Sequence, residues 1–203
     1  ETEVDTLQKF ALSRGTANSI HAVKTLVRLI DKPTGNIYWA VTVRGIDGKL
    51  DVPGGAREIG ENVFASVIRE GEEELGLRIT PQKIIGVMEK EANTSAQRKR
   101  ANITTIQSQV EVDNFQKISV GKYNPALDFF AIKIPEQKEL KLVYAVKNWK
   151  GLEKLEKLYS PQGKEHKDPW IHKYYGDLIR ADMRTMGADR SISDSKRQDQ
   201  DRS

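Results

Sequence analysis

The sequence predicts an α/β fold, in which an amphipathic helix packs against a sheet. Segments rich in β-branched and aromatic residues precede residue 50 and recur after residue 80, as is typical of strands. Between them, residues 63–75 carry apolar side chains at helical spacing. The length of 203 residues suits one globular domain with appended segments.

The first strands are predicted at residues 19–31 and 37–43. In the first, apolar and β-branched side chains alternate with other residues from position 23 to position 29, so one face of the strand is suited to a core. The segments KPTGN (32–36) and GIDGK (45–49) contain the Pro and Gly that mark turns. LDVPGG (50–55) then leads through a loop into the helix.

The helix at 63–75 has sequence signals at both ends. Asn62 is suited to the N-cap, and Gly76 stands where a helix favours a C-terminal glycine. Glu70, Glu73 and Glu74 are three or four positions apart and share one face. Their mutual repulsion, at the negative end of the helix dipole, is unfavourable by itself. A hard divalent cation such as Mg²⁺ would compensate for it, although acidic helix faces are more commonly just solvated.

Residues 55–77 also match a longer pattern, GX5EX7REUXEEXGU, where U is aliphatic. Its fixed positions are occupied by Gly55, Glu61, Arg69, Glu70, Glu73, Glu74 and Gly76. This segment resembles the Nudix box of hydrolases that act on nucleoside diphosphates linked to another moiety. The resemblance implies a Nudix-type α/β/α sandwich with a mixed β-sheet.

The resemblance also implies roles for particular residues. It assigns the binding of Mg²⁺ or Mn²⁺ to the Gly54 carbonyl, Glu70, Glu73 and Glu74, and it assigns catalysis to Glu61, Arg69, Glu70, Glu73 and Glu74. The implied reaction is attack of a cation-activated water on a phosphorus of a diphosphate bridge. In many members the general base lies outside the box, and Glu89, Glu91 and Glu111 are candidates, although each is more commonly a surface residue. The downstream or upstream marks of the ADP-ribose, dinucleoside polyphosphate and coenzyme A subfamilies are absent, so the substrate stays open.

Gly71 departs from the box, where the family has an aliphatic residue. Glycine inside a helix costs about 1 kcal/mol relative to alanine, so we expect Gly71→Ala to stabilise the helix by about 0.5–1 kcal/mol. An alternative is that a neighbouring strand or another chain presses against this turn. The alternative function follows from it: a Nudix-fold structural or regulatory subunit of a large assembly, such as a mitochondrial ribonucleoprotein.

Further elements are predicted after the box. Strands are expected at 83–91, 103–112 and 127–134, with loops at 93–100 and 113–125. A short helix is expected from Trp149 onward in the lysine-rich region 136–158, and a terminal helix at 172–186. The predicted organisation is an N-terminal arm at 1–18, a Nudix domain at 19–186 with an insertion at 92–125, and a polar C-terminal tail at 187–203.

Composition limits the remaining alternatives. Apolar residues make up 37% and charged residues 31% of the chain, cysteine is absent, and the formal net charge is +4. No apolar run is long enough for a membrane span, so a soluble protein in the cytoplasm or the mitochondrial matrix is expected. The expected partners are a nucleotide or nucleotide-linked substrate, and RNA or a protein assembly through the basic segments and the tail.

Overall fold

The computed structural model describes residues 19–94, 97–113, 116–118, 128–133, 142–160 and 168–189. The predicted arm at 1–18 and nearly all of the predicted tail lie outside them. Contacts divide the chain into two compact units that interleave along the sequence. The first contains residues 19–28, 53–94 and 97–110 of the described part, and the second contains the rest. The limits of the predicted domain at 19–186 remain a prediction.

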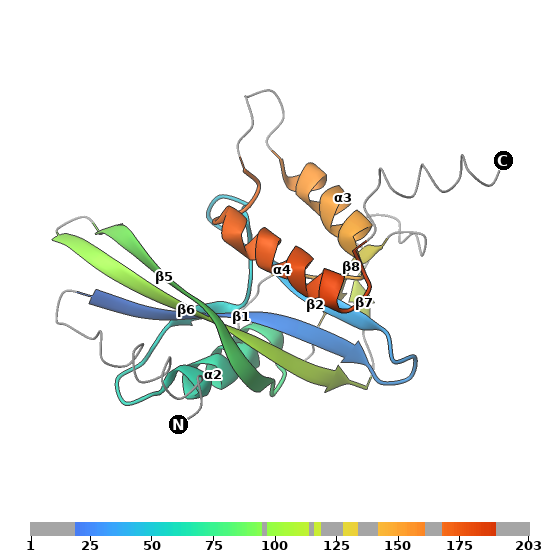
Figure 1. The fold of residues 1–203 in the computed structure, drawn as a ribbon, viewed down its shortest axis with the longest axis horizontal. Coiled ribbons are helices and arrows are strands. Elements are labelled where there is room, and N and C mark those ends of the chain that lie inside the picture. Colours follow the sequence, from blue (N-terminus) through green and yellow to red (C-terminus); the bar gives the residue numbers. More distant parts are fainter. Residues whose placement is uncertain are drawn as a thin grey trace. The chain divides into compact units, whose positions relative to one another are not determined.

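The first unit combines strands with the helix of the box (Figure 1). Its elements are most of β1 (Ser19–Asp31), β4 (Gly54–Ala56), α2 (Val63–Leu75), β5 (Thr80–Thr94) and most of β6 (Gln97–Val112). β4 pairs antiparallel with β1, and β5 pairs antiparallel with β6. The core of this unit is aliphatic, because Val23, Val27, Val67, Leu75 and Ile106 are almost completely buried.

The second unit contains the other strands and two helices. Its strands are β2 (Ile37–Val43), β3 (Leu50–Asp51), β7 (Gln116–Ile118), β8 (Phe129–Lys133) and β9 (Leu142–Val146). They follow the order β2–β9–β8–β7, with β3 paired to β2. The helices are α3 (Trp149–Tyr159) and α4 (Lys173–Thr185).

A segment before α4 secures the short strand β3. Leu50 donates its N–H to the Pro169 carbonyl at 2.8 Å and accepts the N–H of Ile171 at 2.9 Å. The side chain of Trp170 between them is buried, and its Nε1 donates to Glu156 on α3. Trp39 on β2 likewise donates its Nε1 to Asp182 on α4, at 2.8 Å. Trp39 and Leu50 therefore form hydrogen bonds with residues that come much later in the chain: Asp182, Pro169 and Ile171.

The predicted α/β class with a mixed sheet is confirmed. The expected elements at 19–31, 37–43 and 63–75 have the predicted bounds, and the helices expected after Trp149 and near 172–186 are present as α3 and α4. Over the described residues, no helix is long and apolar enough to cross a membrane.

Four expectations about the strands were wrong. The predicted loop at 113–125 contains β7, which pairs antiparallel with β8. The predicted loop at 93–100 is part of a long hairpin, because β5 continues to Thr94 and β6 begins at Gln97. The segment 54–56, expected as a loop, pairs with β1 as β4. Strand β9 was missed, since its buried run LVYAV lies within a lysine-rich region.

Gly71 is explained by packing within the chain. It lies buried in α2, and a Cβ added there would lie 2.9 Å from both Cδ1 and Cγ1 of Ile79, the residue before β5. Ile79 is itself 2% exposed, so it has little room to move. The expectation that alanine would stabilise this position is therefore corrected: overpacking opposes the gain in helix propensity, and such clashes typically cost about 1–3 kcal/mol.

We predict that Gly71→Ala lowers the free energy of unfolding, and that it does so because of Ile79. In an Ile79→Ala background the same substitution should be favourable, because the new methyl group partly fills the cavity. Urea unfolding of the four proteins in this double-mutant cycle should give a coupling energy of at least about 1 kcal/mol.

Gly45→Ala is the control for this cycle, because nothing lies within 4 Å of a Cβ at that position. It should change stability little. A Gly71→Ala protein that is more stable than the wild type would contradict the packing explanation.

Candidate metal and phosphate site in the Nudix-like box

The helix α2 brings the three predicted carboxylates to one end of the first unit. Its N-cap is Asn62, whose side chain accepts the Ala65 N–H at 2.8 Å. It ends at Gly76, which adopts a left-handed conformation with φ of 64°. Both predicted caps are thus confirmed, and Glu70, Glu73 and Glu74 occupy the last turns. The last turn contains no basic residue, and the basic residue of the helix that contacts Glu70 and Glu73 is Arg69, one turn earlier.

Two of these carboxylates are buried against β4. Glu70 is 6% and Glu74 is 2% exposed. Glu74 Oε2 accepts the N–H of Gly54 at 3.1 Å. A Cβ at Gly55 would overlap the Glu70 carboxylate, and one at Gly54 would overlap the backbone of β1. Gly54 is therefore required by the close approach of β4 to β1, and Gly55 leaves room for the Glu70 carboxylate of the helix.

The orientation of Gly54 bears on its predicted role as a ligand. Thr25 donates its N–H to the Pro53 carbonyl, and the register places Gly54 opposite Lys24. In an antiparallel ladder this is a non-hydrogen-bonded pair, so the N–H and C=O of Gly54 both point away from β1. The N–H is used by Glu74. The carbonyl thus leaves the strand on the side that is not paired with β1.

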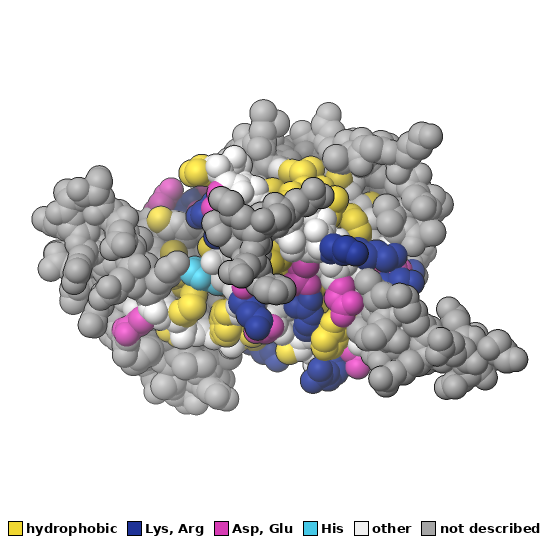
Figure 2. Space-filling model, turned by 90° about the horizontal axis from the view of Figure 1, so that it is seen from above, with side chains coloured by type: hydrophobic (Ala, Val, Ile, Leu, Met, Phe, Trp, Pro, Cys, Tyr) yellow, Lys and Arg dark blue, Asp and Glu magenta, His cyan; other side chains and the backbone are white. Residues whose placement is uncertain are grey.

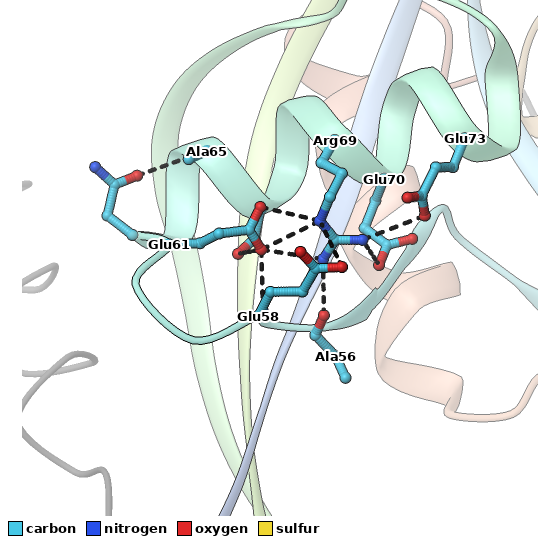
Figure 3. Close-up of polar contacts among 9 residues, drawn as sticks. Ala56, Glu58, Glu61, Ala65, Arg69, Glu70 and Glu73 are labelled. Carbon is cyan, nitrogen blue, oxygen red and sulfur yellow. Dashed lines mark hydrogen bonds and ion pairs between the residues drawn. The ribbon is translucent and has the colours of Figure 1, made fainter.

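Arg69 is the cation at the centre of the box (Figure 3). Its Nε donates to Glu61 Oε2 at 2.9 Å, and its Nη2 donates to the Ala56 carbonyl at 2.9 Å. Its Nη1 donates to Glu70 Oε1 at 3.1 Å and to Glu73 Oε2 at 3.2 Å. One planar guanidinium group therefore joins the loop before α2 to both carboxylates on the helix.

Glu61 is held in its ionised form. Besides Arg69, it accepts the Glu58 N–H at 3.0 Å and the Ser66 hydroxyl at 3.1 Å. The hydrogen bond from Arg69 is the largest of the effects that lower the pKa of Glu61, and burial opposes it only in part. Glu61 thus acts on the loop and on Arg69, which matches the supporting role that the box implies.

Glu70 has the opposite electrostatic balance. Burial is the largest cause of its raised pKa, and the charges of Glu74 and Glu73 add to it, while Arg69 acts in the other direction. Arg69 therefore offsets only part of the effect of burial and of the neighbouring carboxylates on Glu70.

The donor chemistry of this cluster fits a hard divalent cation. Mg²⁺ favours carboxylate and carbonyl oxygens, and a cation would oppose the effects on Glu70 that Arg69 offsets only in part. In the geometry described, however, the carboxylates are arranged around Arg69, and no group of three or more His, Cys, Asp or Glu in the described segments could hold a metal ion as it stands. The metal-binding roles of Gly54, Glu70, Glu73 and Glu74 therefore remain a prediction.

The candidate general bases are not drawn into this cluster by any contact described. Glu89 on β5 and Glu111 near the end of β6 are exposed. The side chain of Glu91 lies outside the described part of the structure. No choice among the three follows from the geometry.

Two residues of the loop before α2 were missed by the sequence analysis. Glu58 Oε1 lies 3.6 Å from Arg69 Nε, and Arg57 has a buried side-chain nitrogen, Nη1, that makes no hydrogen bond. Both occupy variable positions of the box, so the pattern gives no signal for them. Only the pairing of β4 with β1 shows where Arg57 is held.

Comparison with known proteins gives distant structural similarities only. No protein-family profile and no curated protein matches the sequence. A binary complex of the Ap4A hydrolase of C. elegans has 12% identity and a TM-score of 0.49 over 83% of this chain and 98% of that one. A NUDIX hydrolase from Nitrosomonas europaea has 14% identity and a TM-score of 0.48, over 86% and 94% of the two chains. The MutT protein of Methanosarcina mazei Go1 has 20% identity and a TM-score of 0.44, over 83% and 99%.

These neighbours carry the names of Nudix hydrolases, which is the family that the box resembles. Their identities and scores are too low to transfer an activity or a substrate to this chain. The chemistry of the chain therefore has to be derived from its own residues.

We predict opposite effects on stability for Glu61→Gln and Glu70→Gln in the presence of EDTA. The pKa of Glu61 is lowered in the folded protein, so its contribution is present above about pH 4.5 and is lost as the pH falls. Glu61→Gln should cost about 1.5–3 kcal/mol at pH 7, as for other charge-assisted hydrogen bonds, and less at pH 4.

The pKa of Glu70 is raised, so its ionised form opposes folding and does so increasingly as the pH rises. Glu70→Gln should therefore be neutral or stabilising at pH 7. Urea unfolding of both variants and the wild type between pH 4 and pH 8 measures these effects. If both substitutions destabilised the protein equally at pH 7, the charge balance described for the box would be wrong.

Proposed function

We propose that the protein is a Mg²⁺- or Mn²⁺-dependent hydrolase of a nucleoside diphosphate linked to another moiety, such as a nucleotide or the 5′ end of an RNA. One observation carries the proposal: Glu70 and Glu74 are both buried one helical turn apart, with Arg69 as the cation that contacts this group. Such like-charged burial is costly in a purely structural cluster. It is useful where a divalent cation and a phosphate meet.

The proposed ligands of the cation are the Glu70, Glu73 and Glu74 carboxylates and the Gly54 carbonyl. When bound, a divalent cation supplies positive charge to phosphoryl oxygens and lowers the pKa of a water. Glu61 and Arg69 hold the loop and the helix in register, through contacts that do not need the cation.

Arg69 shares two of its partners with the proposed cation. Its Nη1 contacts the same two carboxylates, Glu70 and Glu73, that a cation would use. Its Nε and Nη2 contact Glu61 and Ala56 on the other side. When a cation binds, Nη1 would lose its contacts with Glu70 and Glu73, whereas Nε and Nη2 would keep Glu61 and Ala56. Until then, Arg69 serves as a counter-ion of the acidic cluster.

The alternative, a docked subunit without primary catalysis, loses one of its supports. It relied in part on the small residue Gly71, and the side chain of Ile79 now explains that glycine. Both basic and acidic side chains lie on the face shown in Figure 2. The segment 92–125, the lysine-rich region 136–158 and the polar tail also motivated this alternative, and nearly all of the tail lies outside the described residues.

We predict that Mg²⁺ or Mn²⁺ raises the melting temperature of the wild type and does so much less for Glu74→Gln. A ligand that binds only the folded state stabilises it by mass action, and the substitution removes one proposed ligand. The amide oxygen that the substitution introduces can still accept the Gly54 N–H, so the fold should be retained. Differential scanning calorimetry with and without EDTA measures the effect.

Glu72→Gln is the matched control for this experiment. Glu72 lies on the same helix but is exposed, so the substitution removes the same charge from outside the cluster. Equal stabilisation of wild type, Glu72→Gln and Glu74→Gln by the cation would exclude this cluster as the binding site.

A parallel prediction concerns activity on a panel of nucleoside diphosphate derivatives and capped RNAs. On the substrate that is turned over, Glu73→Gln should lower kcat by at least about 10²-fold, because the developing phosphoryl charge is no longer stabilised. Glu72→Gln should remain active. Release of phosphate-containing products with Mg²⁺ and with Mn²⁺ provides the assay, and full activity of Glu73→Gln would remove that residue from the site.

A further inference from the structure

Arg57, a basic residue of the box, has no acidic partner among the residues that the structure describes. It follows β4, and its Nη1 is buried without a hydrogen-bond acceptor. In the described part of the chain, Arg57 takes part in no ion pair, whereas Arg69 in the same box contacts four carboxylates, those of Glu58, Glu61, Glu70 and Glu73. A buried guanidinium nitrogen without a hydrogen-bond acceptor is unusual, since buried polar groups nearly always have a hydrogen-bond partner.

The backbone holds Arg57 in a fixed place. Its N–H donates to the His21 carbonyl at 2.8 Å, which extends the β1–β4 ladder by one pair beyond Ala22 and Ala56. His21 is therefore the cross-strand neighbour of Arg57. Its imidazole carries no negative charge, so this neighbour does not neutralise the guanidinium.

The strand also determines which face Arg57 shares. Side chains two residues apart in a strand project from the same face. A Cβ at Gly55 would point into the Glu70 carboxylate. Arg57 lies two residues after Gly55 along this ladder. Its side chain therefore projects from the same face as the Cβ position of Gly55, which is the face on which the Glu70 carboxylate lies.

The nearby acids are already engaged. Glu58 and Glu61 face Arg69, and Glu74 accepts the N–H of Gly54. Arg69 is thus the arginine that contacts the carboxylates of the box, and Arg57 takes part in none of these ion pairs.

An unsatisfied buried donor is costly, so a residue of this kind is expected where a ligand supplies the acceptor. The ligand chemistry follows from the guanidinium. Its planar set of N–H donors matches the oxygens of a phosphate. A diphosphate is also long enough to contact a guanidinium with one phosphate while its other phosphate lies nearer the acidic cluster.

We infer that Arg57 binds a phosphate group of a diphosphate-containing ligand, next to the carboxylates of α2. The location of this phosphate relative to a cation rests on the proposed function, but the contact between Arg57 and the phosphate does not require the cation. Arg57 would then select substrates that carry a second phosphate.

The test uses inorganic pyrophosphate as the probe, with the full chain in EDTA and at constant ionic strength. Isothermal titration calorimetry should show binding to the wild type, at least about 10-fold weaker binding to Arg57→Met, and intermediate binding to Arg57→Lys, which keeps the charge but not the planar donors. Arg44→Met is the matched control, because Arg44 is paired with Asp47 in the turn between β2 and β3. It should bind pyrophosphate as the wild type does.

A second measurement separates a ligand-binding role from a structural one. Methionine keeps the aliphatic part of the side chain and removes the unsatisfied donor, so Arg57→Met should be at least as stable as the wild type without ligand. A clear loss of stability would show that the guanidinium has a structural partner, and would overturn the inference.

The outcomes also distinguish this inference from the proposed function. Glu74→Gln should lose hydrolysis but retain pyrophosphate binding in EDTA. Pyrophosphate binding that is absent from the wild type, or equal in wild type and Arg57→Met, would refute the role of Arg57 even if the protein hydrolyses a nucleotide. A protein that hydrolyses nothing but shows the Arg57-dependent binding would refute the proposed function and keep the phosphate site.

Discussion

The arrangement of the box depends on the guanidinium of Arg69. Among the contacts described, Arg69 and the Ser66 hydroxyl are the groups of the helix that bind the side chains of Glu58 and Glu61, and Arg69 is the residue that opposes the effect of Glu73 and Glu74 on the pKa of Glu70. A single side chain therefore decides both the position of the loop and the electrostatic potential at the end of α2. Lysine could supply the charge, but it could not reach the acids and the Ala56 carbonyl in several directions at once.

The close contact of β4 with α2 sets the second constraint. Gly54 and Gly55 have no Cβ, so β4 lies close to α2. The Gly54 N–H reaches the Glu74 carboxylate, and the Cα of Gly55 lies next to the Glu70 carboxylate. The buried carboxylates are thus positioned by backbone rather than by flexible side chains. Positions defined in this way are suited to chemistry that tolerates little displacement.

Local features were predictable from the sequence, whereas pairings between distant segments were not. The caps Asn62 and Gly76 act within one turn of the helix, and their signals lie next to the element they end. The polar ends of β5 and β6 are strands because of their pairing with each other, so their own composition is a poor guide. Strand β9 has a strand-like composition, LVYAV, but the lysine-rich residues around it hide the signal. The need for glycine at position 71 also could not be predicted, because it comes from a packing contact with Ile79, which lies beyond the end of the helix. Arg57 could not be found at all, since its state depends on which acids Arg69 already occupies.

The contacts of Trp39 and Leu50 affect the order in which the chain folds during synthesis. Trp39 emerges from the ribosome long before Asp182, and Leu50 long before Pro169 and Ile171. Until residues 169–182 have been translated, Trp39 and Leu50 lack these hydrogen-bond partners. Contacts of such large sequence separation are slow to form. The packing of Trp39 and the pairing of β3 are therefore completed only after the residues of α4 have been made.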